Sequence, residues 1–187
     1  PKCHWASIGK PLKLITSEIA LTPNLYGPRD NFHPENSHVI AALIQRFHKA
    51  KINHSEVVTA WGTGRPLREF MHVDDLAKAC IHIMNIDEKI FTKHVSKTVS
   101  HINIGTGEEI SIRELTELVA KVVGFNGRIS WDSSKPDGTP RKIMDSSKLV
   151  NLGWNASITL ADGLENAYEW FLNNKIKQKK FAVGKKH

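Results

Sequence analysis

The sequence predicts an α/β fold in which helices pack with short strands around an incomplete Rossmann sheet. Helical patterns of apolar residues outnumber strand-like segments, and the strands that occur are short and alternate with helices. No Gly-x-Gly-x-x-Gly or Gly-x-x-Gly-x-x-Gly motif is present, so a complete dinucleotide-binding half is not expected. A chain of 187 residues can bury roughly 70% of its unfolded surface, which is enough for one hydrophobic core.

The first predicted helix spans His38–Lys51. Its apolar residues fall at helical spacing, and Ser37 is well placed to cap its first turn. The preceding segment, residues 23–37, contains three prolines and a glycine, which favour an ordered loop over a regular element. Loops of that length within a compact domain are usually functional.

Two short strands are expected next, over Val57–Ala60 and Leu67–Val73. They flank a Gly-Thr-Gly-Arg-Pro turn, so we expect them to form a hairpin or a crossing pair. Asp74 is a suitable N-cap for a helix over Leu76–Ile86. Residues 85–100 are polar and rich in lysine, which is typical of a connecting segment.

The second half of the chain continues the alternation of strands and helices. Ser111 and Glu114 have the spacing of a capping box at the start of a helix, and Gly124 is placed to end that helix. The remaining expected elements are strands over His101–Gly105 and Arg128–Trp131, a loop over Asp132–Lys142, and helices over Ser146–Leu152 and Leu160–Asn173.

The composition is that of an ordinary globular protein, with 40% hydrophobic and 24% charged residues. No apolar run approaches the roughly 20 residues that span a membrane, so we expect a soluble protein, and the two widely separated cysteines fit a reducing cytoplasm. Cys3 and Cys80 are far apart, and the ten histidines show no metal-ligand spacing, so neither disulfides nor a metal site are expected. The chain opens with Pro1 and lacks a signal-peptide pattern, which we interpret as a truncation point.

The net charge of +7 is concentrated in a basic tail, residues 175–187. Six lysines in this segment account for most of the charge, and the rest of the chain is nearly neutral. A solvated terminus is the simpler interpretation. An electrostatic contact with nucleic acid or a membrane stays open as the alternative, although the tail has no ladder of interleaved aromatic residues.

Arg68 is the strongest candidate for a ligand-binding residue. A guanidinium held on a strand matches phosphate oxygens in a bidentate way that an ammonium does not. Arg68 lies among apolar residues in a segment predicted to be half-buried, which favours phosphate binding over a role in surface solubility. Arg46, Arg141 and Lys142 lie beside loops or strand ends, where surface solubility is the simpler explanation.

Three further positions have both a structural and a functional interpretation. His38 starts a helix whose positive end favours a neutral imidazole, and such a base would suit proton abstraction next to a carbonyl, although capping or packing is simpler. Trp61 could stack on a nucleobase, but an aromatic residue before a glycine turn more often belongs to the core. Asp74 and Asp75 could form an acid/base pair, but we favour a helix cap.

The sequence resembles the GDP-L-fucose synthase family of extended short-chain dehydrogenases/reductases, over about Thr22–Asn174. The Arg-Glu-Phe-x-His-Val-Asp-Asp motif is shared across the extended superfamily, whereas the Asn-Phe-His-Pro and Lys-Pro-Asp-Gly-Thr-Pro-Arg-Lys loops are much narrower. The matching segments are Asn24–Pro34, Ser37–Ile40, Arg46–Phe47, Trp61–Gly62, Arg68–Phe70, His72–Asp75, Ser100–Asn103 and Ser134–Lys142.

The resemblance implies an NADP-dependent, typically homodimeric enzyme. Such an enzyme epimerises GDP-4-keto-6-deoxy-D-mannose at C3 and C5 and then reduces C4 to give GDP-L-fucose. By the same resemblance, His38 is the acid/base histidine of epimerisation, and Asn24, Leu25 and His38 lie along the nicotinamide cofactor. The positions implied to hold the GDP-sugar are Arg46, Trp61, Arg68, Asp137 and Lys142.

The chain departs from the family pattern at its start. Residues 1–21 do not match, and neither Tyr26 nor Tyr168 has a lysine four positions later, so the Tyr-x-x-x-Lys pair that delivers a proton during reduction is absent. We expect a non-matching segment over 1–21, a nucleotide-sugar-binding domain with a remnant of the cofactor domain over 22–174, and the basic tail. Such a chain should not catalyse the reaction by itself.

Two alternatives stay open at this point. The chain could be the substrate domain of another NAD(P)-dependent nucleotide-sugar epimerase or dehydratase, since part of the motif set is shared across the superfamily. It could instead be a non-catalytic nucleic-acid-binding protein that uses the lysine tail. Competition between nucleotides separates the first from the main hypothesis, and salt-sensitive nucleic-acid binding identifies the second.

Overall fold

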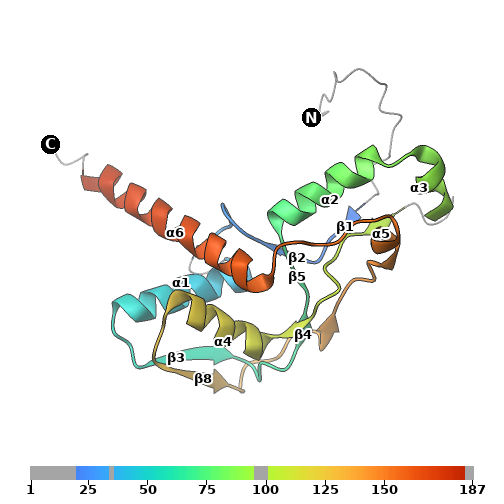
Figure 1. Cartoon of the computed structure of the whole chain (residues 1–187). Helices are drawn as coiled ribbons and strands as arrows, with labels where there is room; N and C mark the ends of the chain where they lie inside the picture. Colours follow the sequence, from blue (N-terminus) through green and yellow to red (C-terminus); the bar gives the residue numbers. More distant parts are fainter. Residues whose placement is uncertain (1–19, 34–35, 95–100, 184–187) are drawn as a thin grey trace.

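The computed structural model of the chain describes residues 20–33, 36–94 and 101–183 (Figure 1). Helices alternate with short strands, so the predicted α/β fold is confirmed. The elements are β1 Ala20–Leu21, β2 Asn24–Tyr26, α1 Val39–Ile52, β3 Val57–Trp61, β4 Leu67–Arg68, β5 Phe70–His72, α2 Val73–Asn85, α3 Glu88–His94, β6 Ile102–Asn103, β7 Ile110–Ser111, α4 Ile112–Val123, β8 Arg128–Asp132, β9 Arg141–Lys142, α5 Ser147–Asn151 and α6 Leu160–Val183.

Two of the predicted segments lie largely outside the described residues. The non-matching start of the chain is described only from Ala20 onward. The basic tail is described only as the backbone of the last part of α6, up to Val183. The long polar connection predicted after α2 proves to contain a short helix, α3, before residues 95–100, which also lie outside the described part.

The described strands form small, mostly parallel sheets. β1 pairs with β6, β2 with β5 and β3 with β8, all in parallel. β4 lies between β7, to which it is antiparallel, and β9, to which it is parallel. The predicted pairing of the strands on either side of the glycine turn is therefore wrong. The turn sends β3 and β4 into different sheets, and each finds partners more than 40 residues further along the chain.

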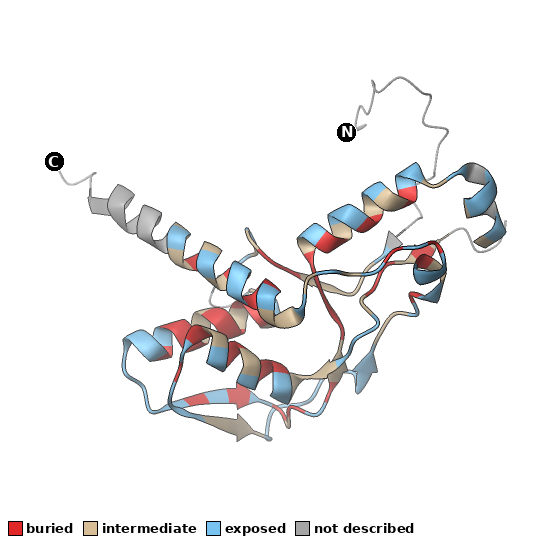
Figure 2. Ribbon diagram, viewed as in Figure 1, coloured by how far each residue is buried: buried red, intermediate tan, exposed pale blue. Residues whose placement is uncertain are grey.

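Two hydrophobic clusters meet at β5. In the first cluster α1, α4 and α6 pack together, with Phe47, Leu115 and Leu164 almost fully buried. The second cluster lies under α2 and α5 and includes Met71. Successive residues of a strand point to opposite faces, and Phe70 and Met71 accordingly belong to different clusters. Figures 1 and 2 show this arrangement, with buried residues on the inner faces of α1 and α4 and along β5.

Asn24–Tyr26, at the start of the segment predicted to be a loop, form a strand that the sequence did not predict. Asn24–Tyr26 pairs residue by residue with Phe70–His72. Pro23 precedes the strand, where its missing N–H costs no ladder hydrogen bond. The partner strand, about 45 residues further along the chain, thus imposes an extended conformation that local composition disfavours.

The capping box at the start of α4 is confirmed. The Ser111 hydroxyl accepts a hydrogen bond from the Glu114 N–H at 3.1 Å, and the Glu114 carboxylate accepts one from the Ser111 N–H at 2.9 Å. The helix ends at Gly124, which has a φ of 73° and closes it in the left-handed conformation. Both ends of α4 therefore follow from local sequence signals.

Removing this cap gives the first prediction. Ser111→Ala is expected to lower the free energy of unfolding by about 1 kcal/mol, because the Glu114 N–H in the first turn loses its partner. Urea denaturation followed by circular dichroism measures the change. Ser133→Ala, an exposed serine outside any helix, is the control and should change stability by less than about 0.5 kcal/mol. Equal effects of the two substitutions would contradict the capping role.

The caps predicted for the other two helices are wrong by one or two residues. The N-cap of α1 is His38, and the Ser37 hydroxyl is buried without a hydrogen-bond partner among the described residues. The N-cap of α2 is His72, whose Nδ1 accepts a hydrogen bond from the Asp74 N–H at 3.2 Å. The helix α2 thus begins directly where β5 ends, which leaves Asp74 and Asp75 within its first turn.

Asp75 fastens α2 to the segment before α6. Its side chain is only 1% exposed and accepts hydrogen bonds from the N–H groups of Ser157 and Ile158 at 2.9 and 2.8 Å, and from the Ser157 hydroxyl at 2.9 Å. Lys78 lies 3.3 Å from the same carboxylate. Asp75 is therefore a structural link between segments about 80 residues apart, and not part of a helix cap.

None of the helices in the described residues has the length and apolar character that a membrane span requires.

Candidate functional site

Two adjoining cavities bring most of the predicted site residues together. One, of about 310 Å³, is lined by Asn24, Leu25 and His38. The other, of about 260 Å³, is lined by Asn24, Trp61, Arg68 and Asp137. Both cavities also share Val39 and Phe70 as lining residues, so they form two parts of one cleft between β2, β4 and the start of α1.

Asn24 and His38 are positioned by the backbone around them. The Asn24 side-chain amide donates a hydrogen bond to the Glu69 carbonyl at 2.9 Å, which ties β2 to the junction of β4 and β5. His38 is the N-cap of α1, but its side chain makes no capping hydrogen bond and is exposed. The imidazole therefore belongs to the residue at the positive end of a helix, but it is not bound to the N–H groups of the first turn.

Trp61 lies at the end of β3 and is 66% exposed, so the prediction that it belongs to the core is wrong. The Arg46 guanidinium lies 5.8 Å from the centre of the indole ring, and the Lys135 ammonium lies 6.0 Å from it. Arg46 also donates a hydrogen bond to the Thr59 carbonyl at 3.1 Å, which holds it beside β3. An exposed indole flanked by cations suits a planar, electron-rich ligand group such as a nucleobase.

Arg68 and Lys142 are direct neighbours on β4 and β9. Arg68 is half-buried and donates a hydrogen bond to its neighbouring Leu67 carbonyl at 2.8 Å, while Lys142 is exposed. Gly138 leaves room for the guanidinium, since a Cβ atom there would lie 3.0 Å from Arg68 Nη2. Neither cation forms an ion pair with a carboxylate in the part of the chain that the structure describes. Two like charges at adjacent positions repel, and a bound anion relieves that repulsion.

Arg141, next to Lys142 on β9, is already occupied. Its Nε and Nη2 atoms donate to the two carboxylate oxygens of Glu109 at 2.7 and 3.2 Å. The hydrogen bond and the negative charge of Glu109 raise the pKa of Arg141 above its usual value. Because side chains alternate along a strand, one cation of this pair is bound to Glu109 and the other stands beside Arg68.

Asp137 lines the cleft but is engaged with the glycine turn between β3 and β4. Its two carboxylate oxygens accept hydrogen bonds from the Thr63 N–H at 2.8 Å and the Thr63 hydroxyl at 2.6 Å. These hydrogen bonds, the one from the hydroxyl first, lower the pKa of Asp137. Gly62 has a φ of 77°, and a Cβ atom there would collide with the Asp137 carboxylate. Asp137 thus fixes the loop before β9 to the turn before β4.

A second contact holds the same turn from the other side. The Arg113 guanidinium donates to the Thr63 carbonyl at 2.8 Å and stacks on Trp131, 4.4 Å from the ring centre. Gly64 lies against this ring, with φ at 75° and no room for a Cβ atom. The turn is therefore fixed on both sides, which sets the spacing between Trp61 at one end and Arg68 at the other.

Residues 18–105 match the model of the NAD dependent epimerase/dehydratase family. The chain belongs to this family. It is 58% identical to GDP-L-fucose synthase 1 of Arabidopsis thaliana over 185 residues, which cover 93% of this chain and 54% of that protein. It is 53% identical to GDP-L-fucose synthase of Escherichia coli strain K12 over 151 residues, covering 81% of this chain and 47% of that protein.

A solved structure supports the same assignment of the fold. A GDP-L-fucose synthetase from Naegleria fowleri bound to NADP superposes with a TM-score of 0.73 at 25% sequence identity. The match covers 85% of this chain and 47% of that one. The chain thus spans about half the length of each of these relatives.

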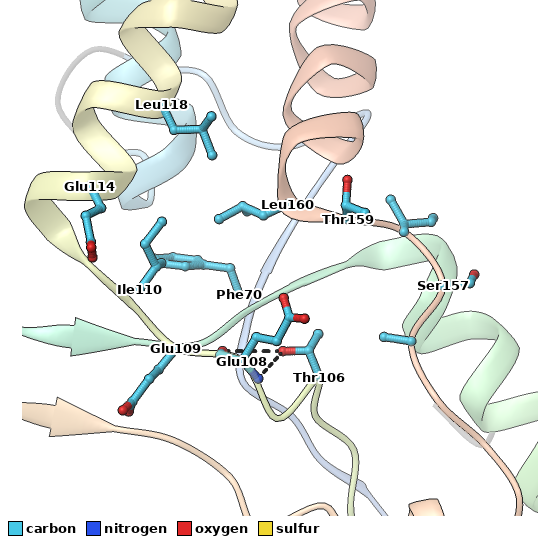
Figure 3. A pocket seen from close by; sticks show the side chains of 12 residues that line it. Phe70, Thr106, Glu108, Glu109, Ile110, Glu114, Leu118, Ser157, Thr159 and Leu160 are labelled. Carbon is cyan, nitrogen blue, oxygen red and sulfur yellow. Dashed lines mark hydrogen bonds between the residues drawn. The ribbon is translucent and has the colours of Figure 1, made fainter.

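A third cavity of this epimerase/dehydratase family member, of about 450 Å³, is also lined by Phe70 (Figure 3). Its described lining includes three glutamates and no cationic residue, so it does not suit a phosphate. Two of these carboxylates are already bound, Glu109 to Arg141 and Glu114 to the first turn of α4. Figure 3 shows Glu108 beside Thr106, whose hydroxyl accepts a hydrogen bond from the Glu108 N–H and donates one to the Glu108 carbonyl.

Sequence reasoning missed several residues of the site. Lys135 stands near the Trp61 ring, Thr63 binds Asp137, and Phe70 lines all three cavities. The glycines around Thr63 signalled a tight turn, but nothing local identified its partner 74 residues away. Among the described residues no group of three or more His, Cys, Asp or Glu side chains could hold a metal ion.

Proposed function

We propose that this chain binds a GDP-linked sugar and provides the substrate-binding part of the GDP-L-fucose synthase reaction. The observation that carries the proposal is Arg68, which lines the cleft together with the exposed Trp61 and has a second cation, Lys142, as its neighbour on the next strand. A diphosphate satisfies the cations and a guanine base covers the indole. The names of the relatives, GDP-L-fucose synthases at 53% and 58% identity, support this choice of nucleotide.

Different residues bind different parts of the ligand. Arg68 and Lys142 hold the diphosphate, and Trp61 stacks on the base beside Arg46. Asp137 keeps the glycine turn in place through Thr63, so its contribution to binding is to fix the spacing of the other groups. The sugar then points along the cleft toward the cavity that His38 lines.

His38 is the proposed base for epimerisation. Its exposed imidazole has no capping hydrogen bond, so one ring nitrogen can exchange a proton with one face of a carbon next to the keto group. Inversion of that carbon then requires a second acid/base group on the opposite face. C3 and C5 both flank the C4 carbonyl of the proposed substrate, which makes their protons acidic. A single histidine beside that carbonyl therefore reaches both positions.

NADPH would supply the hydride for reduction at C4. Asn24, Leu25 and His38 line a cavity of about 310 Å³, which fits the nicotinamide end of this cofactor and not the whole dinucleotide. The 187 residues contain neither a glycine fingerprint for its diphosphate nor a Tyr-x-x-x-Lys pair. We therefore propose that this chain by itself binds the GDP-sugar but does not reduce it. Reduction takes place in a homodimeric NADP-dependent assembly that includes a cofactor domain. The proposed location is the cytoplasm, where cysteines stay reduced.

Calorimetric titration of the 187-residue chain tests the proposal. GDP is expected to bind at least about tenfold more tightly than guanosine, because charged hydrogen bonds to phosphate each contribute about 1.5–3 kcal/mol. GDP should also bind more tightly than UDP or dTDP. No NADPH oxidation is expected with GDP-4-keto-6-deoxy-D-mannose, and oxidation would disprove the claim that this chain does not reduce the sugar.

The alternatives give different results in the same experiments. Equal or tighter binding of UDP or dTDP would identify another nucleotide-sugar enzyme. Salt-sensitive affinity for nucleic acid that vanishes when residues 175–187 are deleted, without any preference for GDP, would identify a binding protein that uses the lysine tail. Deletion of the tail should leave GDP affinity unchanged if the cleft is the binding site.

A further inference from the structure

Glu69 joins the segments that surround Arg68. It lies between β4 and β5 and its side chain is fully buried, with 0% exposure. One carboxylate oxygen, Oε1, accepts hydrogen bonds from the N–H groups of Thr106 and Gly107 at 2.6 and 3.0 Å and from the Thr106 hydroxyl at 3.2 Å. The other oxygen, Oε2, accepts one from the Met144 N–H at 2.8 Å.

The Met144 contact reaches the end of β9. Met144 follows Lys142 by two residues, so Glu69 fixes the chain immediately after the cation that stands opposite Arg68. The Glu69 backbone acts in the same region, because its carbonyl accepts hydrogen bonds from the Asn24 N–H at 3.3 Å and the Asn24 side-chain amide at 2.9 Å. One residue thus connects β2, β4, the turn after β6 and the end of β9.

Gly105 makes the close approach of this turn possible. A Cβ atom at Gly105 would lie 2.5 Å from Glu69 Oε1, which is too close for any side chain. The turn must therefore carry glycine at this position for its N–H groups to reach the carboxylate. The requirement comes from the Glu69 contact, because Gly105 itself is not among the residues with a positive φ.

A buried carboxylate is costly unless several donors satisfy it. Glu69 has donors on both of its oxygens, and a well-packed apolar residue could fill the same space at similar or lower cost in stability. What an apolar residue could not do is fix the distances to two separate segments at once. The arrangement therefore favours a role in positioning the residues of the cleft.

We propose that Glu69 is a positioning residue for the diphosphate-binding pair. It holds the end of β9 against β4, so that Lys142 stays beside Arg68. The proposal rests on the proposed function of the cleft, in which these two cations bind the diphosphate. The Glu69 side chain is fully buried and bonded to backbone N–H groups, so it acts through the exposed Lys142 and not by touching the ligand.

The substitution Glu69→Gln tests this role with almost no change in volume. An amide can accept hydrogen bonds on one side only, and its NH₂ group repels any N–H on the other side. The amide oxygen keeps the three donors of Thr106 and Gly107, and the NH₂ group then faces Met144. The hydrogen bond that fixes the end of β9 is lost, while the fold around the turn is kept.

The measurement is the preference for GDP over guanosine. Glu69→Gln is expected to weaken GDP binding by about tenfold, which is the loss of one charged contact, and to change guanosine binding by less than about twofold. In a Lys142→Ala background, Glu69→Gln should have almost no further effect on GDP affinity, because the residue that it positions is already gone. A fully additive double variant overturns the proposal.

Asp75→Asn is the matched control for a general loss of stability. Asp75 is also a buried carboxylate that accepts backbone hydrogen bonds, but it holds the segment before α6 and not β9. It should lower stability and leave the ratio of GDP to guanosine affinity unchanged. If Asp75→Asn reduces this ratio as much as Glu69→Gln does, the effect is one of stability and the positioning role is wrong.

A second variant keeps the test decisive if Glu69→Gln does not fold. Gly105→Ala pushes directly on Oε1 and displaces the carboxylate without removing its charge. Like Glu69→Gln, it should lower the preference for GDP over guanosine. An unchanged preference overturns the proposal. A wild-type chain without any preference for GDP would refute the proposed function together with this inference. If the wild-type chain prefers GDP and Glu69→Gln keeps that preference, only the inference about Glu69 is refuted. Where Glu69→Gln does not fold, an unchanged preference in Gly105→Ala has the same meaning.

Discussion

Arg68→Ala is expected to weaken the binding of GDP by about tenfold or more and to leave guanosine binding almost unchanged. The guanidinium is half-buried on β4, lies close to Gly138 and has no carboxylate partner among the described residues. A charged hydrogen bond to phosphate contributes about 1.5–3 kcal/mol, and about 1.4 kcal/mol corresponds to a factor of ten. Calorimetric titration with the two ligands measures the effect.

Two further variants make this prediction specific. Arg141→Ala removes an arginine that lies three residues from Gly138 but is bound to Glu109, so it should change GDP affinity by less than about twofold. Arg68→Lys keeps the charge but loses the bidentate geometry, and it should give an intermediate affinity. If Arg68→Ala and Arg141→Ala weaken GDP binding equally, a general positive potential is responsible and Arg68 is not a specific contact.

Asp75→Ala should lower the free energy of unfolding by about 3 kcal/mol, the largest stability effect that we expect. The buried carboxylate accepts three hydrogen bonds from Ser157 and Ile158, and its removal leaves the N–H groups of these two residues without that partner. Urea denaturation measures the loss. Asp74→Ala is the control, since its side chain is 67% exposed and contributes mainly through the helix dipole, so it should cost less than about 1 kcal/mol.

The same residue should make stability depend on acidic pH. Burial by itself would raise the pKa of Asp75, but the hydrogen bonds from Ile158, Ser157 and Lys78 outweigh it and lower the pKa below the usual value of 3.8. A carboxyl group whose pKa is lower in the folded state stabilises the fold above its unfolded pKa, and that stabilisation disappears as the pH falls through the folded pKa. The difference in unfolding free energy between wild type and Asp75→Asn should therefore shrink below about pH 4. A difference that stays constant down to pH 2 would contradict this account.

Helices with local signals at their ends could be predicted well from the sequence. The spacing of apolar residues located α1, and the Ser111–Glu114 box together with Gly124 located both ends of α4. The signals are local because a helix forms its own hydrogen bonds within a few residues. The resemblance to one enzyme family also named candidate residues, most of which line the cleft, whereas Arg46 and Lys142 are not among its lining residues.

Pairings between distant segments could not be predicted in this way. β3 pairs with β8 about 70 residues later, and nothing in either strand identifies the other. The partners of Glu69 and Asp75 could not be predicted either. In the sequence, these two are simply charged residues, one beside a strand and one at the start of a helix. Each is in fact buried and bound to backbone N–H groups 37 to 83 residues away. The sequence shows which residue supplies the carboxylate. It does not show the partners of that carboxylate, because they are backbone N–H groups, which every residue except proline possesses.

The meeting of two hydrophobic clusters at β5 has a consequence for cooperativity. Leu25 packs on one cluster, Val39 and Phe70 belong with the other, and all three line the same cavity of the cleft. A ligand in that cavity contacts both clusters at once and binds only when they are joined. By mass action it stabilises their junction, so the two halves should unfold as a single unit in the presence of a saturating ligand.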